Sequence, residues 1–392
     1  MILVNQKREL YLYFLAMLTA GMVLVAHGPC VDTLIDTFDS DKVGIGFLAS
    51  AYSLGTFPGV FLAEWVVRRY GAKKGLTGIT LLRSLVLLVF SLNNSLPVAY
   101  VLYGLVGATN GLLFAGLTAQ TTRRTAPHQS RYLSWLYSAF GLGVVLGPLM
   151  IGSLLAHGHG WRLAYRLLAL CTATGVLLLL GSEAPAPKED TPNGKPFRPL
   201  PAAFYFWCLA LTSYVATEGA LSTWSSKYIL DVFEHGIGYQ IVTIFWVFMF
   251  LGRLLAGWLL PFFSEQSFVS FACGVAFVCT MIASQASSLL WVLIAFAGTA
   301  LALAGIYPGI MSLISKQFAS FGDRATNMAT ALGNVGVIGF TPLVGAIADM
   351  KTLRGAIFVS ALPLLIVIAV IAAFIMTQSN DIAARRSKCD LS

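Results

Sequence analysis

Long runs of apolar residues alternate with short polar segments along the whole chain. A helix that crosses the hydrocarbon core of a bilayer needs about 20 predominantly apolar residues, and most of these runs reach that length. We therefore predict about twelve transmembrane helices. They are expected at 10–35, 43–67, 75–92, 97–121, 132–156 and 161–181, and then at 203–230, 238–262, 267–286, 288–316, 324–349 and 354–377.

One polar segment is much longer than the others and lies near the middle of the chain. Between Gly181 and Leu200 it is rich in proline and in charges of both signs, so it cannot bury enough apolar surface to fold alone. We predict an all-α membrane protein built as two pseudo-symmetric six-helix bundles. The predicted parts are an N-terminal bundle (1–181), a cytoplasmic linker (182–202), a C-terminal bundle (203–377) and a cytoplasmic tail (378–392).

The composition agrees with lipid as the solvent. Hydrophobic residues make up 57% of the chain and charged residues 11%, against roughly 25% charged in soluble domains. The runs are unbroken rather than alternating, which excludes an outer-membrane barrel. The net charge of +8 does not indicate nucleic acid, because the basic residues gather in short loops. Their distribution predicts both termini in the cytoplasm of a multi-pass protein of the bacterial inner membrane.

Motifs for other functions are missing from the sequence. We find no phosphate-binding G-x-x-x-x-G-K-[ST] loop, no H-E-x-x-H and no G-x-S-x-G. No cysteine pair has metal-ligand spacing. We therefore expect no enzyme, no cofactor and no metal site. The expected role is movement of a small solute across the membrane.

The two halves share a weak internal similarity. The fifth predicted span has glycines ahead of Pro148, and the eleventh has glycines ahead of Pro342. Glycine lets helix backbones approach closely, and proline adds a local bend. Many secondary transporters consist of two related halves with the solute site near the midplane.

At this point the chain resembles the major facilitator superfamily over nearly its whole length. The similarity lies in the basic loop at 68–74, in Gly147-Pro148 and in Trp161-Arg162. Arg68 stands where that family's loop has an aspartate, so the family's charge pairing does not transfer to this loop.

A closer resemblance is to the fucose permease branch of sugar:proton symporters. It is carried by the span that holds Tyr214, Glu218, Trp224 and Tyr228, by Tyr307-Pro308, and by the stretch Cys30-Val31-Asp32-Thr33-Leu34. In that branch the aspartate of the first span couples transport to protons, which implies this role for Asp32. The fourth span departs from the branch, since Thr109-Asn110 stands where the permease has a buried glutamate.

Ionisable groups inside a membrane are costly, so each is a functional hypothesis. Asp32 is either a proton acceptor or a carboxylate at the wet end of its helix, beside Asp36. Glu218 is a second proton site, an acceptor for a polar solute, or a structural hydrogen-bonding group. Arg83 is expected to snorkel to the inner surface, the alternative being a side chain that attracts an anionic substrate.

Other candidates complete the predicted site. Proton coupling is assigned to Asp32 and Glu218, and gating on the cytoplasmic side to Glu64, Arg68 and Arg253. The predicted substrate-binding residues are polar or aromatic side chains on apolar spans: His27, Asn110, Tyr214, Glu218, Trp224, Tyr307 and Asn334.

The predicted function is proton-coupled uptake of a small polar, sugar-like solute by alternating access. The expected partners are this solute, protons and the lipid bilayer, and the carrier is expected to act as a monomer. The alternative is a proton-antiport exporter of a drug-like compound or metabolite, which the glycines before Gly147-Pro148 also fit.

Overall fold

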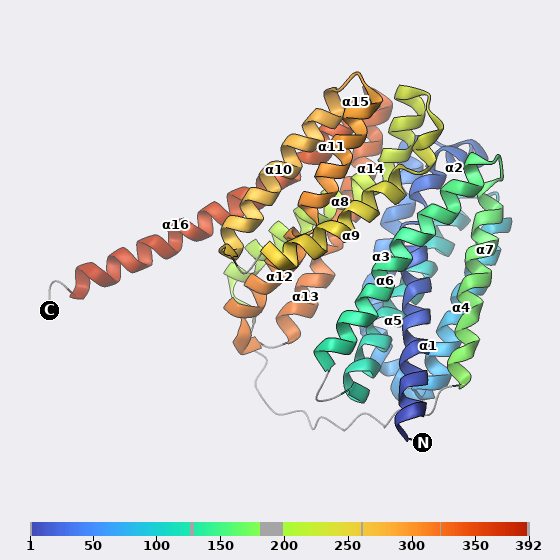
Figure 1. Cartoon of the computed structure of the whole chain (residues 1–392), viewed down its shortest axis with the longest axis horizontal. Helices are drawn as coiled ribbons and strands as arrows, with labels where there is room; N and C mark the ends of the chain where they lie inside the picture. The colour runs from blue at the N-terminus through green and yellow to red at the C-terminus, as the bar shows by residue number, and fades with distance from the viewer. Residues whose placement is uncertain (1, 126–128, 181–198, 260–261, 322, 390–392) are drawn as a thin grey trace. The chain divides into compact units, whose positions relative to one another are not determined.

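The structure is a computed structural model that describes residues 2–125, 129–180, 199–259, 262–321 and 323–389 (Figure 1). Every regular element in these ranges is helical, which confirms the all-α prediction. Nearly all of the linker predicted at 182–202 lies outside the described residues.

The first half of the sequence holds the following elements: α1 (Ile2–Leu24), η1 (Gly28–Cys30), α2 (Val31–Phe38), α3 (Lys42–Tyr70), α4 (Ala72–Leu92), α5 (Leu96–Thr125), α6 (Gln129–Ala156), α7 (Trp161–Ala173) and η2 (Thr174–Leu180). The second half holds α8 (Ala202–Phe233), η3 (Gly236–Tyr239), α9 (Ile241–Leu259), α10 (Glu265–Gln285), α11 (Leu289–Leu303), α12 (Ile306–Gln317), η5 (Ala319–Phe321), α13 (Asp323–Gly333), α14 (Val335–Met350), α15 (Leu353–Ala361) and α16 (Pro363–Cys389).

Within the described ranges, nine spans are long and apolar enough to cross a membrane, and Ile241–Gly257 is a shorter apolar helix. The first span, Arg8–Phe38, is broken in its second half, between the end of α1 and the start of α2. Pro29 lies there in the single turn of η1, and α2 begins directly after it. The last helix, α16, continues to Cys389, past the predicted end at 377.

The chain divides into two compact units, which are described separately. The first unit comprises 1–197, 219–247 and 337–356, so it combines the first half of the sequence with parts of α8, α9, α14 and α15. The second unit comprises 198–218, 248–336 and 357–392.

Glycines allow close helix packing in the first unit. A Cβ atom on Gly55 of α3 would collide with the carbonyl oxygen of Gly104 on α5. A Cβ on Gly143 of α6 would collide likewise with the Leu18 carbonyl of α1. The predicted role of Gly143 in close helix packing is therefore confirmed.

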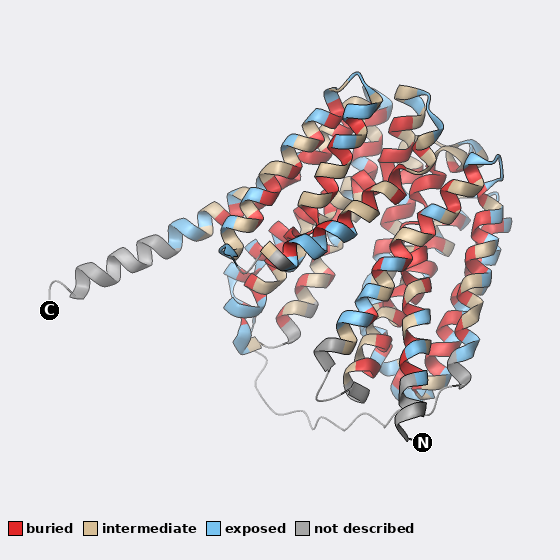
Figure 2. Cartoon of the chain, in the orientation of Figure 1, coloured by how far each residue is buried: buried red, intermediate tan, exposed pale blue. Residues whose placement is uncertain are grey.

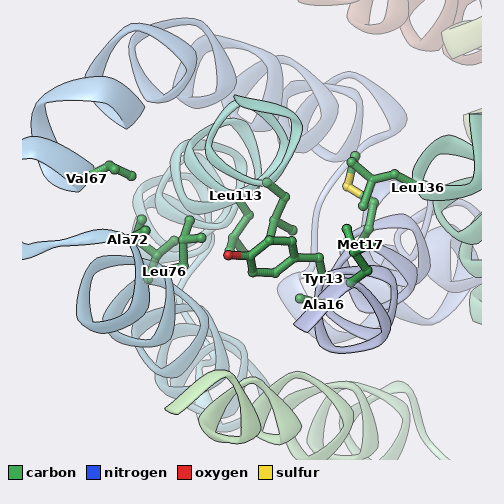
Figure 3. Packing of buried hydrophobic residues seen from close by; sticks show 11 residues of the cluster. Tyr13, Ala16, Met17, Val67, Ala72, Leu76, Leu113 and Leu136 are labelled. Atoms are coloured by element: carbon green, nitrogen blue, oxygen red, sulfur yellow. The ribbon is translucent and has the colours of Figure 1, made fainter. Parts of the chain in front are cut away.

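Apolar side chains fill the space between these helices. Figure 3 shows Tyr13 and Met17 of α1 packed among Leu76 of α4, Leu113 of α5 and Leu136 of α6. Exposed and intermediate residues lie on the outer faces of the helices (Figure 2). Many of the exposed side chains are large and apolar, including Trp65 at 57% exposed. Large apolar side chains exposed on helices of span length are suited to contact with lipid tails.

Candidate functional site

A buried arginine lies among the helices of the first unit. Arg83 of α4 is 0% exposed. Its Nη1 donates to Asn110 Oδ1 on α5 (2.9 Å), and its Nη2 donates to Thr19 Oγ1 on α1 (2.8 Å). The predicted snorkelling of Arg83 is therefore wrong. The sequence does not define the direction of this side chain, and its polar partners lie inside the unit.

The network continues through neutral groups. Asn110 Nδ2 donates to the Tyr52 hydroxyl of α3 at 2.6 Å. The ring centroids of Tyr52 and Tyr103 lie 5.9 Å apart, and Tyr103 also packs edge-on against His27 at 5.8 Å. Four transmembrane helices thus converge on one polar and aromatic cluster. The cluster contains Asn110 and His27, two of the residues predicted to bind substrate.

The contacts of His27 favour one tautomer of its neutral ring. Its Nε2 lies 3.1 Å from Thr223 Oγ1, and this hydroxyl already donates to the Gly219 carbonyl. A hydroxyl has one proton, so Nε2 must be the donor to Thr223. The other nitrogen, Nδ1, is then a buried acceptor, and it has no hydrogen-bond partner. A solute hydroxyl is a group that could donate to it.

A cluster of charged side chains, Lys227, Asp32 and Asp231, also lies in the first unit, beyond the C-terminal end of α1. Lys227 of α8 pairs with Asp32 of α2 and also with Asp231, one turn further along α8, at 2.9 Å. The side chains are 14% exposed for Lys227 and 27% for Asp32. Burial, and secondarily the Asp32 charge, raise the pKa of the nearby Tyr239 phenol. Asp32 is therefore a half-buried carboxylate in an ion pair, rather than a lone acid.

Further contacts at this end join the first and second halves of the sequence. Lys42 Nζ of α3 pairs with Asp349 of α14 at 2.9 Å. Ser50 Oγ donates to the Ile338 carbonyl at 2.6 Å. Trp224 is fully buried and donates through Nε1 to the Thr341 carbonyl at 3.1 Å. Trp224, predicted to bind substrate, therefore packs between helices in this structure.

The second unit holds a separate cluster. The ring centroids of Tyr214 and Tyr307 lie 6.1 Å apart. The Tyr307 hydroxyl is 3.2 Å from Thr330 Oγ1, and Asn334 Nδ2 donates to the Thr330 carbonyl at 2.9 Å. Glu218 is half-buried next to Tyr214.

Arg253 of α9 interacts electrostatically with Glu218. The structure thus brings together Tyr214, Glu218, Tyr307, Asn334 and Arg253, all predicted from the sequence, although Arg253 was assigned to gating. Glu64 and Arg68, the other gating candidates, form an ion pair with each other one turn apart on α3, at 2.6 Å. Both are more than half exposed.

Sequence reasoning missed three features of these sites. It did not consider Lys227 as a site residue, whereas Lys227 lies inside α8 and pairs with Asp32. Tyr103 was not considered, because one tyrosine on an apolar span looks like core packing. Tyr52 was not among the predicted site residues. The sequence signal for Lys227 was its position four residues before Asp231, where the two side chains lie on one helix face.

No three or more His, Cys, Asp or Glu side chains gather as a metal site among the described residues. Carboxylate, imidazole, amide and hydroxyl groups of this kind are able to exchange protons or to form hydrogen bonds.

Relatives were found by sequence. Protein TsgA of Shigella boydii serotype 18 is 21% identical over 359 residues, which cover 88% of this chain and 89% of the relative. The TsgA homolog of Citrobacter koseri is 21% identical over 348 residues, covering 85% and 86% of the two chains.

Solved structures share the fold. The nucleoside transporter NupG superposes with a TM-score of 0.80 at 11% identity, covering 94% of this chain and 99% of that chain. The xylose transporter XylE from E. coli gives 0.77 at 12% identity, covering 92% and 94%. A bacterial homolog of the human lysosomal transporter Spinster gives 0.76 at 14% identity, covering 94% and 96%. At these identities the similarity shows the fold alone.

The family model of the Major Facilitator Superfamily matches residues 12–320, which is most of the chain. With the membrane-spanning helices and the shared fold, this match identifies the protein as a multi-pass membrane transporter that belongs to the Major Facilitator Superfamily.

Proposed function

We propose that the protein takes up a small polar, sugar-like solute by alternating access and couples this uptake to protons. The observation that carries the proposal is the shared ion pair of Lys227 with Asp32 and Asp231, because it joins α2 to α8. The similarity of the Asp32 stretch and of the Tyr214–Glu218 pattern to the fucose permease branch supports it. The proposal includes both termini in the cytoplasm and a monomeric carrier.

The coupling step follows from the charges. When Asp32 takes up a proton it loses its attraction to Lys227, while Lys227 keeps Asp231 as its partner and is not left unpaired. The link between α2 and α8 is then broken at low cost. The Asp32–Lys227 pair re-forms only after Asp32 has lost its proton, and in coupled uptake this proton leaves toward the cytoplasm together with the solute.

We assign solute recognition to buried polar groups that have hydrogen-bonding atoms without a partner. Nδ1 of His27 lacks a donor in the structure, and a buried acceptor left unpaired carries a desolvation penalty of about 1–3 kcal/mol. A hydroxyl of a bound solute would remove that penalty. The cluster of Tyr214, Tyr307 and Asn334 in the second unit offers further polar and aromatic groups for a hydroxylated molecule.

The test is uptake of labelled solutes into cells at several external pH values. We expect saturable uptake that rises as the external pH falls and that Asp32→Asn abolishes. Asp36→Asn is the matched control, because Asp36 lies one turn further on α2 and is exposed. Uptake indifferent to Asp32→Asn and to protonophores would contradict proton coupling. If loss of the gene only makes cells more sensitive to toxic compounds, that result would favour export instead.

A further inference from the structure

Arg83 is a buried cation without a counter-charge. Its guanidinium is 0% exposed, and both of its hydrogen-bond acceptors, Asn110 and Thr19, are neutral. No Asp or Glu side chain among the described residues forms an ion pair with it. A buried charge is costly unless an opposite charge compensates it, and the cost is largest within a membrane.

The arginine also has unused donors. A guanidinium has five N–H groups in a planar fork. Two are used by Asn110 and Thr19, and the Nε–H has no partner although it is buried. The edge formed by Nε and a neighbouring Nη matches the two oxygens of a carboxylate. Neutral hydrogen bonds between helices do not require a cation, so a structural role alone does not account for the charge.

We infer that the first unit contains an anion site, centred on Arg83, that binds the carboxylate of a small monoanionic solute. The inference deepens the proposed function by giving the solute a charge class, and it rests on that proposal only for the transport step. One anion makes the site neutral, since among the described residues no second lysine or arginine hydrogen-bonds to Asn110 or Thr19. A phosphate monoester would leave an excess negative charge inside the membrane. His27, joined to this cluster through Tyr103, would accept from a hydroxyl of the same solute.

Binding to the purified full-length protein tests the site without any transport step. The probes are gluconate, glucuronate, glycerate and lactate, their neutral counterparts glucose and glycerol, and glucose 6-phosphate. Affinity is measured by thermal unfolding and by equilibrium dialysis. We expect at least one monocarboxylate to bind at least tenfold more tightly than its neutral counterpart and than glucose 6-phosphate. Equal binding of the neutral compound, or no binding by any monocarboxylate, would overturn the inference.

Two variants separate binding from structure. Asn110→Asp places a carboxylate where Asn110 Oδ1 now accepts from Arg83 at 2.9 Å, so it supplies the missing counter-charge from within the protein. We expect this variant to melt no lower than the parent and yet to bind the monocarboxylate at least tenfold more weakly. Arg83→Gln should lose the preference for the monocarboxylate over its neutral counterpart. The control is Arg166→Gln, the same change at an exposed position of α7.

The outcomes distinguish the two proposals. If Asn110→Asp keeps the parent's affinity, Arg83 is a structural residue and the anion site is wrong, whether or not uptake is proton-coupled. If the monocarboxylate binds as expected but uptake ignores pH and Asp32→Asn, the anion site stands and proton coupling fails.

Discussion

Replacing Lys227 by glutamine should open the end of the first unit at which α2 meets α8. In the structure Lys227 is the cation between two carboxylates, Asp32 and Asp231. Its removal deletes the attraction across the helices and leaves two negative charges facing each other. The closed arrangement should therefore become less populated.

The magnitude follows from burial. Breaking a fully buried ion pair costs about 3–5 kcal/mol, and an exposed pair contributes about 0–1 kcal/mol. Side-chain exposures of 14% for Lys227 and 27% for Asp32 lie between these limits. We therefore expect loss of the ion pair to shift the equilibrium between the closed and open arrangements by roughly 2 kcal/mol, which is about a 30-fold change in the equilibrium constant.

The opening of this end can be measured by chemical labelling of Cys30. Cys30 is a free thiol, 0% exposed, and it lies two residues before Asp32. In a variant that keeps only this cysteine, the rate of labelling by a membrane-impermeant maleimide reports the opening of this end. We expect Lys227→Gln to raise the rate about 30-fold, in line with the equilibrium change. Lys351→Gln, an exposed lysine directly after α14, should leave the rate within twofold.

The exchange of both charges completes this test. The double variant Asp32→Lys with Lys227→Asp restores an opposite pair across the same two helices, so its labelling rate should return toward the parent. An unchanged rate in Lys227→Gln, or a double variant as fast as the single one, would refute the idea that this ion pair holds the end closed.

Other consequences follow from packing and hydrogen bonding. Gly55→Leu should lower the free energy of unfolding by about 1–3 kcal/mol, because its Cβ meets the α5 backbone. A Cβ on Gly78 would have no atom within 4 Å, so Gly78→Leu should change this free energy by less than about 0.5 kcal/mol. An equal loss in both would contradict the packing argument. Asn110→Leu removes one hydrogen bond to charged Arg83 and one neutral hydrogen bond to Tyr52, so the free energy of unfolding should fall by about 2–4 kcal/mol. A melting temperature equal to the parent's would contradict a stabilising role of this network. Glu218→Gln should raise the half-saturation concentration for uptake at least fivefold at an unchanged melting temperature, whereas a structural role would lower that temperature instead.

The fold was predictable because a bilayer imposes a simple length requirement. Apolar runs of span length show the helices directly, and nine helices among the described residues are long and apolar enough to cross a membrane, against twelve predicted spans. The break before Asp32 was not predicted, although Gly28-Pro29 is a local signal for it.

The candidate sites were predictable only in part. Polar residues on apolar spans are few, so Asn110, Glu218 and Asn334 could be identified by residue type. Their partners could not, because Arg83 reaches Thr19 across 64 residues and Lys227 reaches Asp32 across 195 residues. Pairings between distant helices depend on helix rotation, and the apolar pattern of a fully buried span does not define that rotation.

Proton movement in proteoliposomes tests the central proposal most directly. A pH-sensitive dye outside the vesicles follows the external pH while sugars, sugar acids, nucleosides, amino acids and drugs are added one at a time. Proton-coupled transport predicts that one solute makes the external medium more alkaline and that Asp32→Asn abolishes this response while Asp36→Asn retains it. Solute entry without any change of pH, or an unchanged response in Asp32→Asn, would contradict the assignment of Asp32 as the coupling residue.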